Sequence, residues 1–288
     1  MSAPEILRIG RIDFANLYPI FHCLEKLRFA PTSLCDESLC CPQSFVGGAA
    51  RVQYEFVRGV PSKINALMRQ GYIDVGPASS IEYIRNPHLY DLVEGHCISA
   101  QGQVMSIILY STVDIERLNA ATILTTAQSE TSTALLNIIL ERFYGLDCSF
   151  IDSDVPLNEG LSTHPAYLLI GDNALLEHQR LGQHQKDVYA YDLSTIWYEH
   201  TGEPFVYALW IAQKGLNSAL IEGLMNELDR ARSNALANLH EIAVNSPYAS
   251  TLSVDMLYQY WKIIGYELGD SQKRGLRLFE QYLQQLKK

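Results

Sequence analysis

The sequence lacks several features that would place the protein at a membrane or on nucleic acid. It has no uncharged apolar stretch of about 18 residues, the length that a membrane-spanning helix needs. No basic region followed by a long apolar run stands near Met1, so we expect no signal peptide and a cytoplasmic location. No basic run is interleaved with aromatic residues. We therefore expect neither a membrane nor a nucleic-acid partner.

Familiar catalytic and metal-binding motifs are also missing. Gly-x-Gly-x-x-Gly, the P-loop, Gly-x-Ser-x-Gly and His-Glu-x-x-His do not occur. The eight histidines are scattered, and the six cysteines are too few for a disulfide scaffold in a chain of 288 residues. The one cysteine cluster is Cys35, Cys40 and Cys41, whose spacing does not suit a tetrahedral zinc site. We expect reduced thiols and no metal.

The composition is that of a folded, acidic protein. An apolar content of 48% supports a sizeable core, and 288 residues suffice for two lobes or one large α/β domain. The net charge is −10, from 22 basic and 32 acidic residues. An anionic ligand would therefore need a local source of positive potential, and the amino terminus of a helix is one such source.

A junction of apolar strand, polar residues and helix occurs four times. The junctions are Ile6–Phe14 into Asn16, Tyr72–Gly76 into Pro77, Ser79 and Ser80, Ala121–Leu124 into Ser129, Thr131 and Ser132, and Ala166–Ile170 into Gly171 and Asp172. In a parallel α/β sheet such junctions lie at the carboxyl ends of the strands, where ligands bind. Unpaired N–H groups at helix amino termini favour anions. The pattern predicts a cleft for a small molecule that carries carboxylates.

The order of the expected elements predicts two lobes. A β-α-β-α-β unit, interrupted by a surface loop or insertion at Pro31–Ala50, is followed by two extended segments, Leu92–Ser99 and Val104–Tyr110, without a helix between them. A second α/β unit follows, then the extended run Phe205–Ala212 and helices near Asn217–Ala243, Ser253–Glu267 and Ser271–Lys287. We expect residues 1–100 and 200–288 to form lobe one and residues 101–199 to form lobe two. This double crossover, with a ligand cleft between two hinged lobes, is typical of the α/β type 2 periplasmic-binding-protein folds.

Each candidate site residue also has a structural interpretation. Capping of a helix alone would explain four of them, which are Asn16, Ser79, Ser80 and Asp172. Ser129, Thr131 and Ser132 place three hydroxyls in one first helical turn, where a single cap would suffice, and this excess favours anion binding. Ser106 gains interest from its expected location at the hinge.

Taken in order, six segments resemble the chorismate dehydratases of the futalosine route to menaquinone. They are Asn16-Leu-Tyr-Pro-Ile20, Gly59-Val-Pro-Ser62, Ile73-Asp-Val-Gly-Pro-Ala-Ser-Ser-Ile-Glu-Tyr83, Gly102-Gln-Val-Met-Ser106, Leu169-Ile-Gly-Asp-Asn-Ala-Leu175 and Trp197-Tyr-Glu-His-Thr-Gly-Glu-Pro-Phe205. The resemblance implies a type 2 periplasmic-binding-protein fold used as an enzyme. The implied reaction removes water from chorismate and gives 3-[(1-carboxyvinyl)oxy]benzoate without a cofactor.

On this resemblance, we expect Asn16 and Ser106 to position the ring and the departing hydroxyl. The hydroxyl cluster of Ser129, Thr131 and Ser132 would bind one carboxylate, Ser79 or Ser80 would fix the other side, and Asp172 is a further substrate-binding candidate. The resemblance favours a carboxylate of the substrate as the proton acceptor, and the residue types leave a protein base open. The sister enzyme that makes 1,4-dihydroxy-6-naphthoate has an opening Ser-Pro-Cys-Pro-Asn motif, which this sequence lacks.

Two functions from other classes use the same fold. One is a solute-binding protein of a transporter, which the missing signal peptide argues against. The other is a ligand-sensing module for a small carboxylate, which would typically carry a helix-turn-helix segment before Ile6. The sequence does not indicate an oligomeric state.

Overall fold

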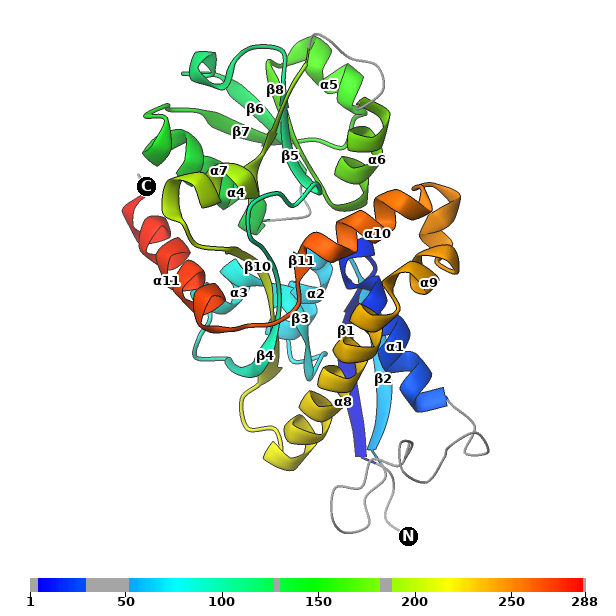
Figure 1. Cartoon of the computed structure of the whole chain (residues 1–288). Helices are drawn as coiled ribbons and strands as arrows, with labels where there is room; N and C mark the ends of the chain where they lie inside the picture. Colours follow the sequence, from blue (N-terminus) through cyan, green and yellow to red (C-terminus); the bar gives the residue numbers. More distant parts are fainter. Residues whose placement is uncertain (1–4, 30–51, 127–129, 182–187, 287–288) are drawn as a thin grey trace.

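The computed structural model describes residues 5–29, 52–126, 130–181 and 188–286, which form two mixed β-sheets flanked by helices. The two sheets stand one above the other in Figure 1. The predicted loop Pro31–Ala50, its three cysteines and Ser129 lie outside the described residues.

The first sheet has six strands in the spatial order β11-β4-β10-β3-β1-β2. Its strands are β1 (Glu5–Ile12), β2 (Val52–Gly59), β3 (Val75–Ser79), β4 (Tyr90–Ala100), β10 (Phe205–Gln213) and β11 (Ile264–Gly265). Strand β1 pairs in parallel with β2 and β3, whereas β10 runs antiparallel to β3 and β4. Segments from the beginning, the middle and the end of the chain thus share this sheet.

The second sheet has five strands in the order β7-β6-β8-β5-β9. Its strands are β5 (Ile107–Ser111), β6 (Thr122–Thr125), β7 (Ser149–Asp152), β8 (Ala166–Ile170) and β9 (Tyr189–Asp192). The chain leaves the first sheet after β4 and returns to it at β10, so the predicted double crossover is confirmed. The residue bounds predicted for the lobes stay a prediction, because sheet membership does not fix where a rigid unit ends.

All four predicted strand-to-helix junctions are present, and β2 leads into a helix as well. The helices at these junctions are η1 (Ala15–Leu17) with α1 (Tyr18–Phe29), α2 (Pro61–Arg69), α3 (Ser80–Arg85), α4 (Glu130–Ile138) and α6 (Gly171–Leu181). The remaining helices are η3 (Ile115–Arg117), the π-helical turn η4 (Ile139–Phe143), α5 (Leu157–Thr163), α7 (Leu193–Thr201), α8 (Ser218–Ala237), α9 (Leu239–Val244), η5 (Pro247–Ser250), α10 (Val254–Ile263) and α11 (Asp270–Gln285). Among the described residues, no helix combines the length and the apolarity needed to cross a bilayer.

The strand predicted at Tyr72–Gly76 is displaced toward the carboxyl end in the structure, where β3 begins at Val75 and ends at Ser79. The prediction ended the strand at Gly76, directly before Pro77. All five residues of β3 are buried, and Pro77 lies within the strand, opposite Trp210 of β10. A Cβ atom on Gly76 would lie 2.9 Å from the Cα atom of Gly10, so β1 and β3 approach closely at two glycines.

The predicted C-terminal helices are shorter than expected. The helix expected over Ser253–Glu267 ends at Ile263, and the next two residues form β11 against β4. A Cβ atom on Gly265 would lie 2.5 Å from the Oγ atom of Ser99, so this glycine allows the close pairing. The helix expected over Asn217–Ala243 is interrupted at Asn238 into α8 and α9.

Buried aromatic residues fix the return connection between the sheets. The rings of Trp197 on α7 and Phe205 at the start of β10 are T-shaped with centroids 5.1 Å apart, and Phe279 of α11 lies 4.8 Å from Phe205. All three side chains are buried. Helix α11 packs so closely here that a Cβ atom on Gly275 would lie 1.9 Å from the carbonyl oxygen of Pro204.

We predict that Gly275→Ala destabilises the protein by about 3 kcal/mol, because the obstructing atom belongs to the backbone and β10 would have to shift. The measurement is chemical unfolding followed by circular dichroism. Gln281→Ala, at an exposed position of the same helix, is the control and should change stability by less than about 0.5 kcal/mol. Equal stabilities of the two variants would contradict the packing described here.

Candidate functional site

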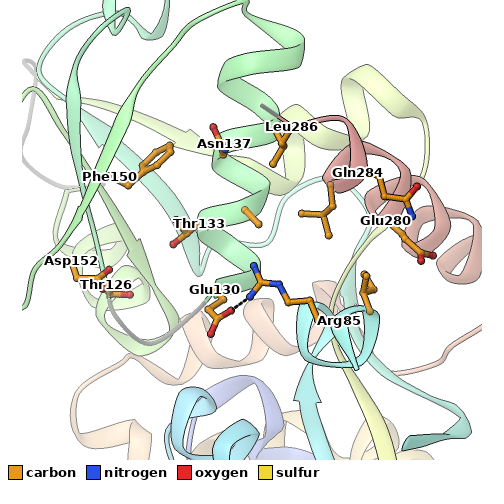
Figure 2. A pocket seen from close by; sticks show the side chains of 13 residues that line it. Arg85, Thr126, Glu130, Thr133, Asn137, Phe150, Asp152, Glu280, Gln284 and Leu286 are labelled. Carbon is orange, nitrogen blue, oxygen red and sulfur yellow. Dashed lines mark hydrogen bonds and ion pairs between the residues drawn. The ribbon is translucent and has the colours of Figure 1, made fainter. Parts of the chain in front are cut away.

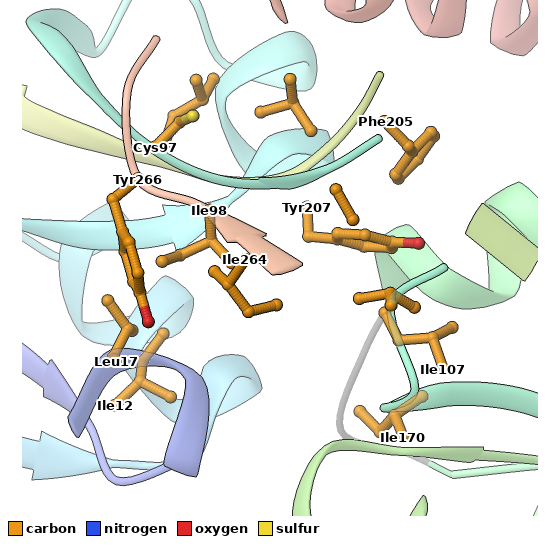
Figure 3. Close-up of a cluster of buried hydrophobic side chains, with 14 of the residues drawn as sticks. Ile12, Leu17, Cys97, Ile98, Ile107, Ile170, Phe205, Tyr207, Ile264 and Tyr266 are labelled. Atoms are coloured by element: carbon orange, nitrogen blue, oxygen red, sulfur yellow. The ribbon is translucent and has the colours of Figure 1, made fainter. Parts of the chain in front are cut away.

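A cavity of about 60 Å³ lies between the two sheets. The wall of this inter-sheet cavity consists of Ile12, Phe14, Asn16, Leu17, Pro61, Ser79, Ile98, Val104, Ser106, Ile107, Ser132, Ile170, Gly171, Tyr207, Ala208 and Ile264. Figure 3 shows isoleucines of both sheets around this space, with Ile12 and Ile98 from the first sheet and Ile107 and Ile170 from the second. The cavity is therefore apolar over most of its wall, with a few polar groups of fixed position, as is usual for small-molecule sites.

Five wall residues stand at the starts of helices. Asn16 lies in η1, Pro61 begins α2, Ser79 is the N-cap of α3, Ser132 lies in the first turn of α4, and Gly171 begins α6. Each helix start carries a partial positive charge from its aligned peptide groups. Helix starts from both sheets thus face one small cavity, which confirms the predicted arrangement of the junctions.

Asn16 lines the cavity, and hydrogen bonds from two C-terminal side chains fix its backbone. The carbonyl oxygen of Asn16 accepts a hydrogen bond of 2.8 Å from the hydroxyl of Tyr266. The preceding carbonyl, that of Ala15, accepts one of 2.7 Å from Nε1 of Trp261. The Oδ1 atom of Asn16 is buried and has no hydrogen bond to a described residue. An unsatisfied buried acceptor is costly, and a ligand donor at this point would satisfy it.

Ser106 lies directly before β5, at the first crossover, and is 3% exposed. The prediction had placed it inside the strand. Its Oγ atom accepts a hydrogen bond of 2.9 Å from the hydroxyl of Tyr260. Its carbonyl oxygen accepts one of 2.7 Å from the backbone N–H of Gly171. Ser106 is therefore tied to α10 through its side chain and to α6 through its backbone.

The turn before Ser106 is held by Asp192. Met105 adopts a left-handed conformation with φ of 62°, which is strained for a residue with a side chain. One carboxylate oxygen of Asp192 accepts hydrogen bonds from the backbone N–H groups of Val104 (2.9 Å) and Met105 (2.8 Å). The other oxygen caps α7 at Ser194 and Thr195. These four bonds compensate the burial that raises the pKa of Asp192.

The two serines at the start of α3 differ in position. Ser79 lines the cavity, and its Oγ atom accepts a hydrogen bond of 2.8 Å from Nδ2 of Asn65. Ser80 is fully buried, does not line the cavity, and donates its hydroxyl to the carbonyl oxygen of Val206 at 2.6 Å. Of these two predicted residues, the structure brings only Ser79 to the cavity wall.

The predicted hydroxyl cluster of α4 is also divided. Ser132 lines the cavity, whereas the Oγ1 atom of Thr131 accepts a hydrogen bond of 3.2 Å from the backbone N–H of Ile81 in α3. Thr131 thus connects the helices of the two sheets. Ser129, the third member, lies outside the described residues.

Asp172 makes a second connection between the two sheets. Its Oδ1 atom accepts a hydrogen bond of 2.9 Å from the backbone N–H of Ala15, at the start of η1. Burial raises the pKa of this carboxyl group to about 6, and the hydrogen bond from Ala15 offsets part of the rise. Asp172 follows the wall residue Gly171 but is itself not part of the wall.

The wall of the inter-sheet cavity carries no charged side chain among the described residues. Burial keeps the pKa of Tyr207, its one ionisable wall residue, well above the usual value, so this phenol stays neutral. Positive charge at this wall is therefore limited to the partial charge of the helix starts, where the N–H groups of Ala15, Ile81 and Gly171 are bonded within the protein. Within the described ranges, no group of three histidine, cysteine or carboxylate side chains is placed to hold a metal ion.

A larger hollow of about 620 Å³ lies between α3, α4 and α11. Its wall consists of Ile84, Arg85, Thr126, Glu130, Thr133, Ala134, Asn137, Phe150, Asp152, Glu280, Leu283, Gln284 and Leu286. Figure 2 shows Arg85 paired with Glu130. The other charged groups of this wall are the carboxylates of Asp152 and Glu280. A negatively charged wall disfavours an anion, so the inter-sheet cavity is the better site for a carboxylate ligand.

Three residues that support the site were not predicted as such: Asp192, Tyr260 and Tyr266. Asp192 had a sequence signal, because an aspartate directly before a helix is a typical N-cap. The tyrosines had none, because Tyr260 fits the apolar stripe of the helix predicted over Ser253–Glu267 and Tyr266 lies within the same predicted helix. Their partners Ser106 and Asn16 are 154 and 250 positions away in the chain.

Solved structures share this fold at low sequence identity. Protein AF1704 of Archaeoglobus fulgidus superposes with a TM-score of 0.73 at 14% identity, covering 97% of each chain. The periplasmic aliphatic sulphonate binding protein SsuA of Escherichia coli gives a TM-score of 0.63 at 14% identity, covering 98% of this chain and 88% of its own. The Candida albicans CA3427 gene product, described as having the generic periplasmic binding protein fold, gives 0.59 at 10% identity, covering 99% and 92%. The predicted fold class is therefore confirmed.

Sequence comparison identifies the family. The chorismate dehydratase of Thermus thermophilus is 26% identical over an alignment of 241 residues that covers 80% of this chain and 87% of that protein. The family model described as menaquinone biosynthesis matches residues 7–285, almost the whole chain and every residue of the inter-sheet cavity. The chain belongs to the menaquinone biosynthesis family.

Proposed function

We propose that the protein is a chorismate dehydratase, a hydro-lyase that converts chorismate into 3-[(1-carboxyvinyl)oxy]benzoate and water. The observation that carries this proposal is the meeting of Asn16 and Ser106 at one uncharged cavity faced by helix starts from both sheets. Membership of the menaquinone biosynthesis family supports it, as does the relative from Thermus thermophilus that bears this name.

The site suits a ligand with two carboxylates. Chorismate carries one carboxylate on its ring and one on its enolpyruvyl group. The starts of α3 and α4, with Ser79 and Ser132, offer hydroxyls and partial positive charge for these groups. We assign Thr131 and Ser80 to supporting bonds, because both hydroxyls are engaged with backbone groups away from the cavity.

The chemistry requires a donor for the departing hydroxyl. The C4–O bond breaks, the C3 proton is removed, and the two together leave as water while the ring becomes aromatic. Ser106 is placed to donate a hydrogen bond to the leaving oxygen, because its Oγ atom already accepts one from Tyr260. Asn16 would orient the ring through its amide, whose oxygen is a buried acceptor awaiting a donor. A preorganised donor of this kind is worth about 3 kcal/mol in the transition state.

We assign the role of base to a carboxylate of the substrate. Among the described residues, the cavity wall has no carboxylate, histidine or amine that could take the C3 proton at neutral pH. A general base must lie within hydrogen-bond reach of the proton it abstracts. A substrate carboxylate held beside its own ring satisfies this condition. The protein would then contribute geometry and hydrogen bonds.

The cavity must widen to admit a substrate. About 60 Å³ corresponds to roughly two water molecules, whereas sites for small organic ligands usually enclose about 300 Å³ or more. The bonds of Asp172 to Ala15 and of Thr131 to Ile81 join the two sheets around the closed cavity. We propose that the lobes separate at these bonds for binding and close again to exclude water.

The alternative function is that of a protein that binds a small carboxylate and does not convert it. The periplasmic sulphonate-binding relative has the same fold, so the fold by itself does not distinguish an enzyme from a solute-binding protein or a ligand-sensing module. The cytoplasmic location expected from the sequence stays a prediction.

Purified protein should consume chorismate and develop the ultraviolet absorbance of a substituted benzoate, with one product formed per chorismate lost. The measurement is continuous absorbance with chromatography of the mixture. A boiled sample corrects for spontaneous decay of chorismate. Full recovery of unchanged chorismate at high protein concentration would favour a binding protein instead.

Asn16→Ala and Ser106→Ala should each lower kcat by about 100-fold or more, because each removes a group aimed at the reacting ring. Ser80→Ala is the matched comparison. It should keep kcat near the wild-type value and lose about 1 kcal/mol of stability with its bond to Val206. Steady-state kinetics and thermal unfolding of the three variants test this. Near-normal turnover by the first two would refute their assigned roles.

Asp172→Asn should change how stability depends on pH. Since the pKa of Asp172 is raised to about 6 in the folded protein, the unfolded chain loses this proton at lower pH than the folded one. The wild type therefore loses stability from this group as the pH rises through that interval. Asparagine keeps the bond to Ala15 without a titrating charge. The difference in unfolding free energy, variant minus wild type, should therefore rise by about 2 kcal/mol from about pH 4.5 to about pH 7.5.

Denaturant unfolding of both proteins at several pH values measures this difference. The other carboxyl groups are common to both proteins and cancel. A difference that does not change with pH would mean that Asp172 titrates as an ordinary carboxyl group.

A further inference from the structure

Helix α10 reaches the candidate site from the C-terminal part of the chain. In Figure 1 it lies between the two sheets, beside the start of α1. Two neighbouring residues on this helix contact the site. Tyr260 donates its hydroxyl to Ser106, and Trp261 donates its indole N–H to the carbonyl oxygen of Ala15. Both side chains are almost completely buried.

The direction of the bond between Tyr260 and Ser106 decides what Ser106 can do. Burial holds the pKa of Tyr260 far above its usual value, so its hydroxyl keeps its proton. Among the described residues, the acceptor for this proton is Oγ of Ser106, at 2.9 Å. In the reverse orientation the proton of Tyr260, which does not line the cavity, would be buried without an acceptor, whereas the proton of Ser106 can turn toward the cavity that this residue lines. Oγ of Ser106 therefore accepts from Tyr260, and its own proton points elsewhere.

The remaining contacts of Ser106 leave the inter-sheet cavity as the direction for that proton. Its carbonyl oxygen is bonded to the N–H of Gly171, and the residue lines the cavity. Asp192 fixes the backbone just before it through the N–H groups of Val104 and Met105. The position of the residue is thus set by the backbone, and the rotation of its hydroxyl is set by Tyr260.

We propose that Tyr260 is a positioning residue for the dehydration, which holds the hydroxyl of Ser106 with its proton directed into the inter-sheet cavity. This inference rests on the proposed function, in which Ser106 donates to the departing hydroxyl. A hydroxyl that accepts one hydrogen bond also becomes a better donor of the next, because chains of hydrogen bonds polarise one another. Tyr260 would thus strengthen the donor as well as orient it.

The test uses a double-mutant cycle in the full-length protein, with chorismate as substrate. Tyr260→Phe removes a single hydroxyl and keeps the ring, and the remaining phenyl group leaves no buried donor unpaired. We expect kcat to fall about 10-fold with KM unchanged, since the bond matters in the transition state and not for carboxylate binding. In the Ser106→Ala background the same change should have no further effect on kcat.

Tyr167→Phe is the matched control. Tyr167 is also buried, on strand β8, and its hydroxyl donates to the carbonyl oxygens of Ser153 and Val155, away from the cavity. It should keep the wild-type kcat even if it loses as much thermal stability as Tyr260→Phe. This comparison separates an effect on Ser106 from a general loss of a buried hydrogen bond.

Three results would overturn the inference. Wild-type kcat in Tyr260→Phe would show that Ser106 needs no orientation. An equal loss of kcat from Tyr260→Phe with and without Ser106 would show that Tyr260 acts by another route. Absence of chorismate turnover by the wild type would remove the proposed function and this inference with it, and that result is distinguishable because it precedes any variant.

Discussion

The starts of helices from both sheets point into one small cavity, and the rest of the site depends on this convergence. Asn16, Pro61 and Ser79 come from the first sheet, and Ser132 and Gly171 come from the second. The chain as a whole is acidic, with a net charge of −10, and no described wall residue carries a positive charge. Compensation for an anionic ligand therefore has to come from neutral donors, which are the hydroxyls of the wall and the peptide N–H groups of the helix starts, and their positions are fixed by the strands before them.

The same kind of donor joins the two sheets to each other. The N–H of Ala15 is bound by the carboxylate of Asp172, and the N–H of Ile81 is bound by the hydroxyl of Thr131. Both acceptors come from helices of the second sheet. Closure of the cavity therefore uses N–H groups at the same helix starts that face a bound ligand. The burial of Asp172 opposes its ionisation, which limits how stable the closed arrangement becomes at neutral pH.

Local sequence patterns were enough to predict the strand-to-helix junctions, the double crossover and the fold class. They were also enough to bring Asn16, Ser79, Ser106 and Ser132 to one place, because all four stand at strand ends or at the crossover. They did not show that Ser79 lines the cavity and Ser80 does not. Which of two adjacent side chains points to the cavity depends on where the preceding strand ends. The prediction ended that strand too early, at Gly76 instead of Ser79.

The support of the site could not be predicted from local patterns. Tyr260 and Tyr266 contact Ser106 and Asn16 across most of the length of the chain, and nothing in their own neighbourhoods distinguishes them from core residues. Asp192 was readable as a helix cap, but its second pair of bonds, to Val104 and Met105, depends on the left-handed turn that the tertiary structure imposes. Long-range contacts of this kind require the fold.

The size of the inter-sheet cavity has a kinetic consequence. In the proposed reaction the benzoate keeps every carbon atom and both carboxylates of chorismate, so it is nearly as large as its precursor. A space of about 60 Å³ that has to widen for arrival has to widen again for departure. Incoming and outgoing molecules would share one gate, and the benzoate, as it accumulates, would compete with fresh chorismate for the open form.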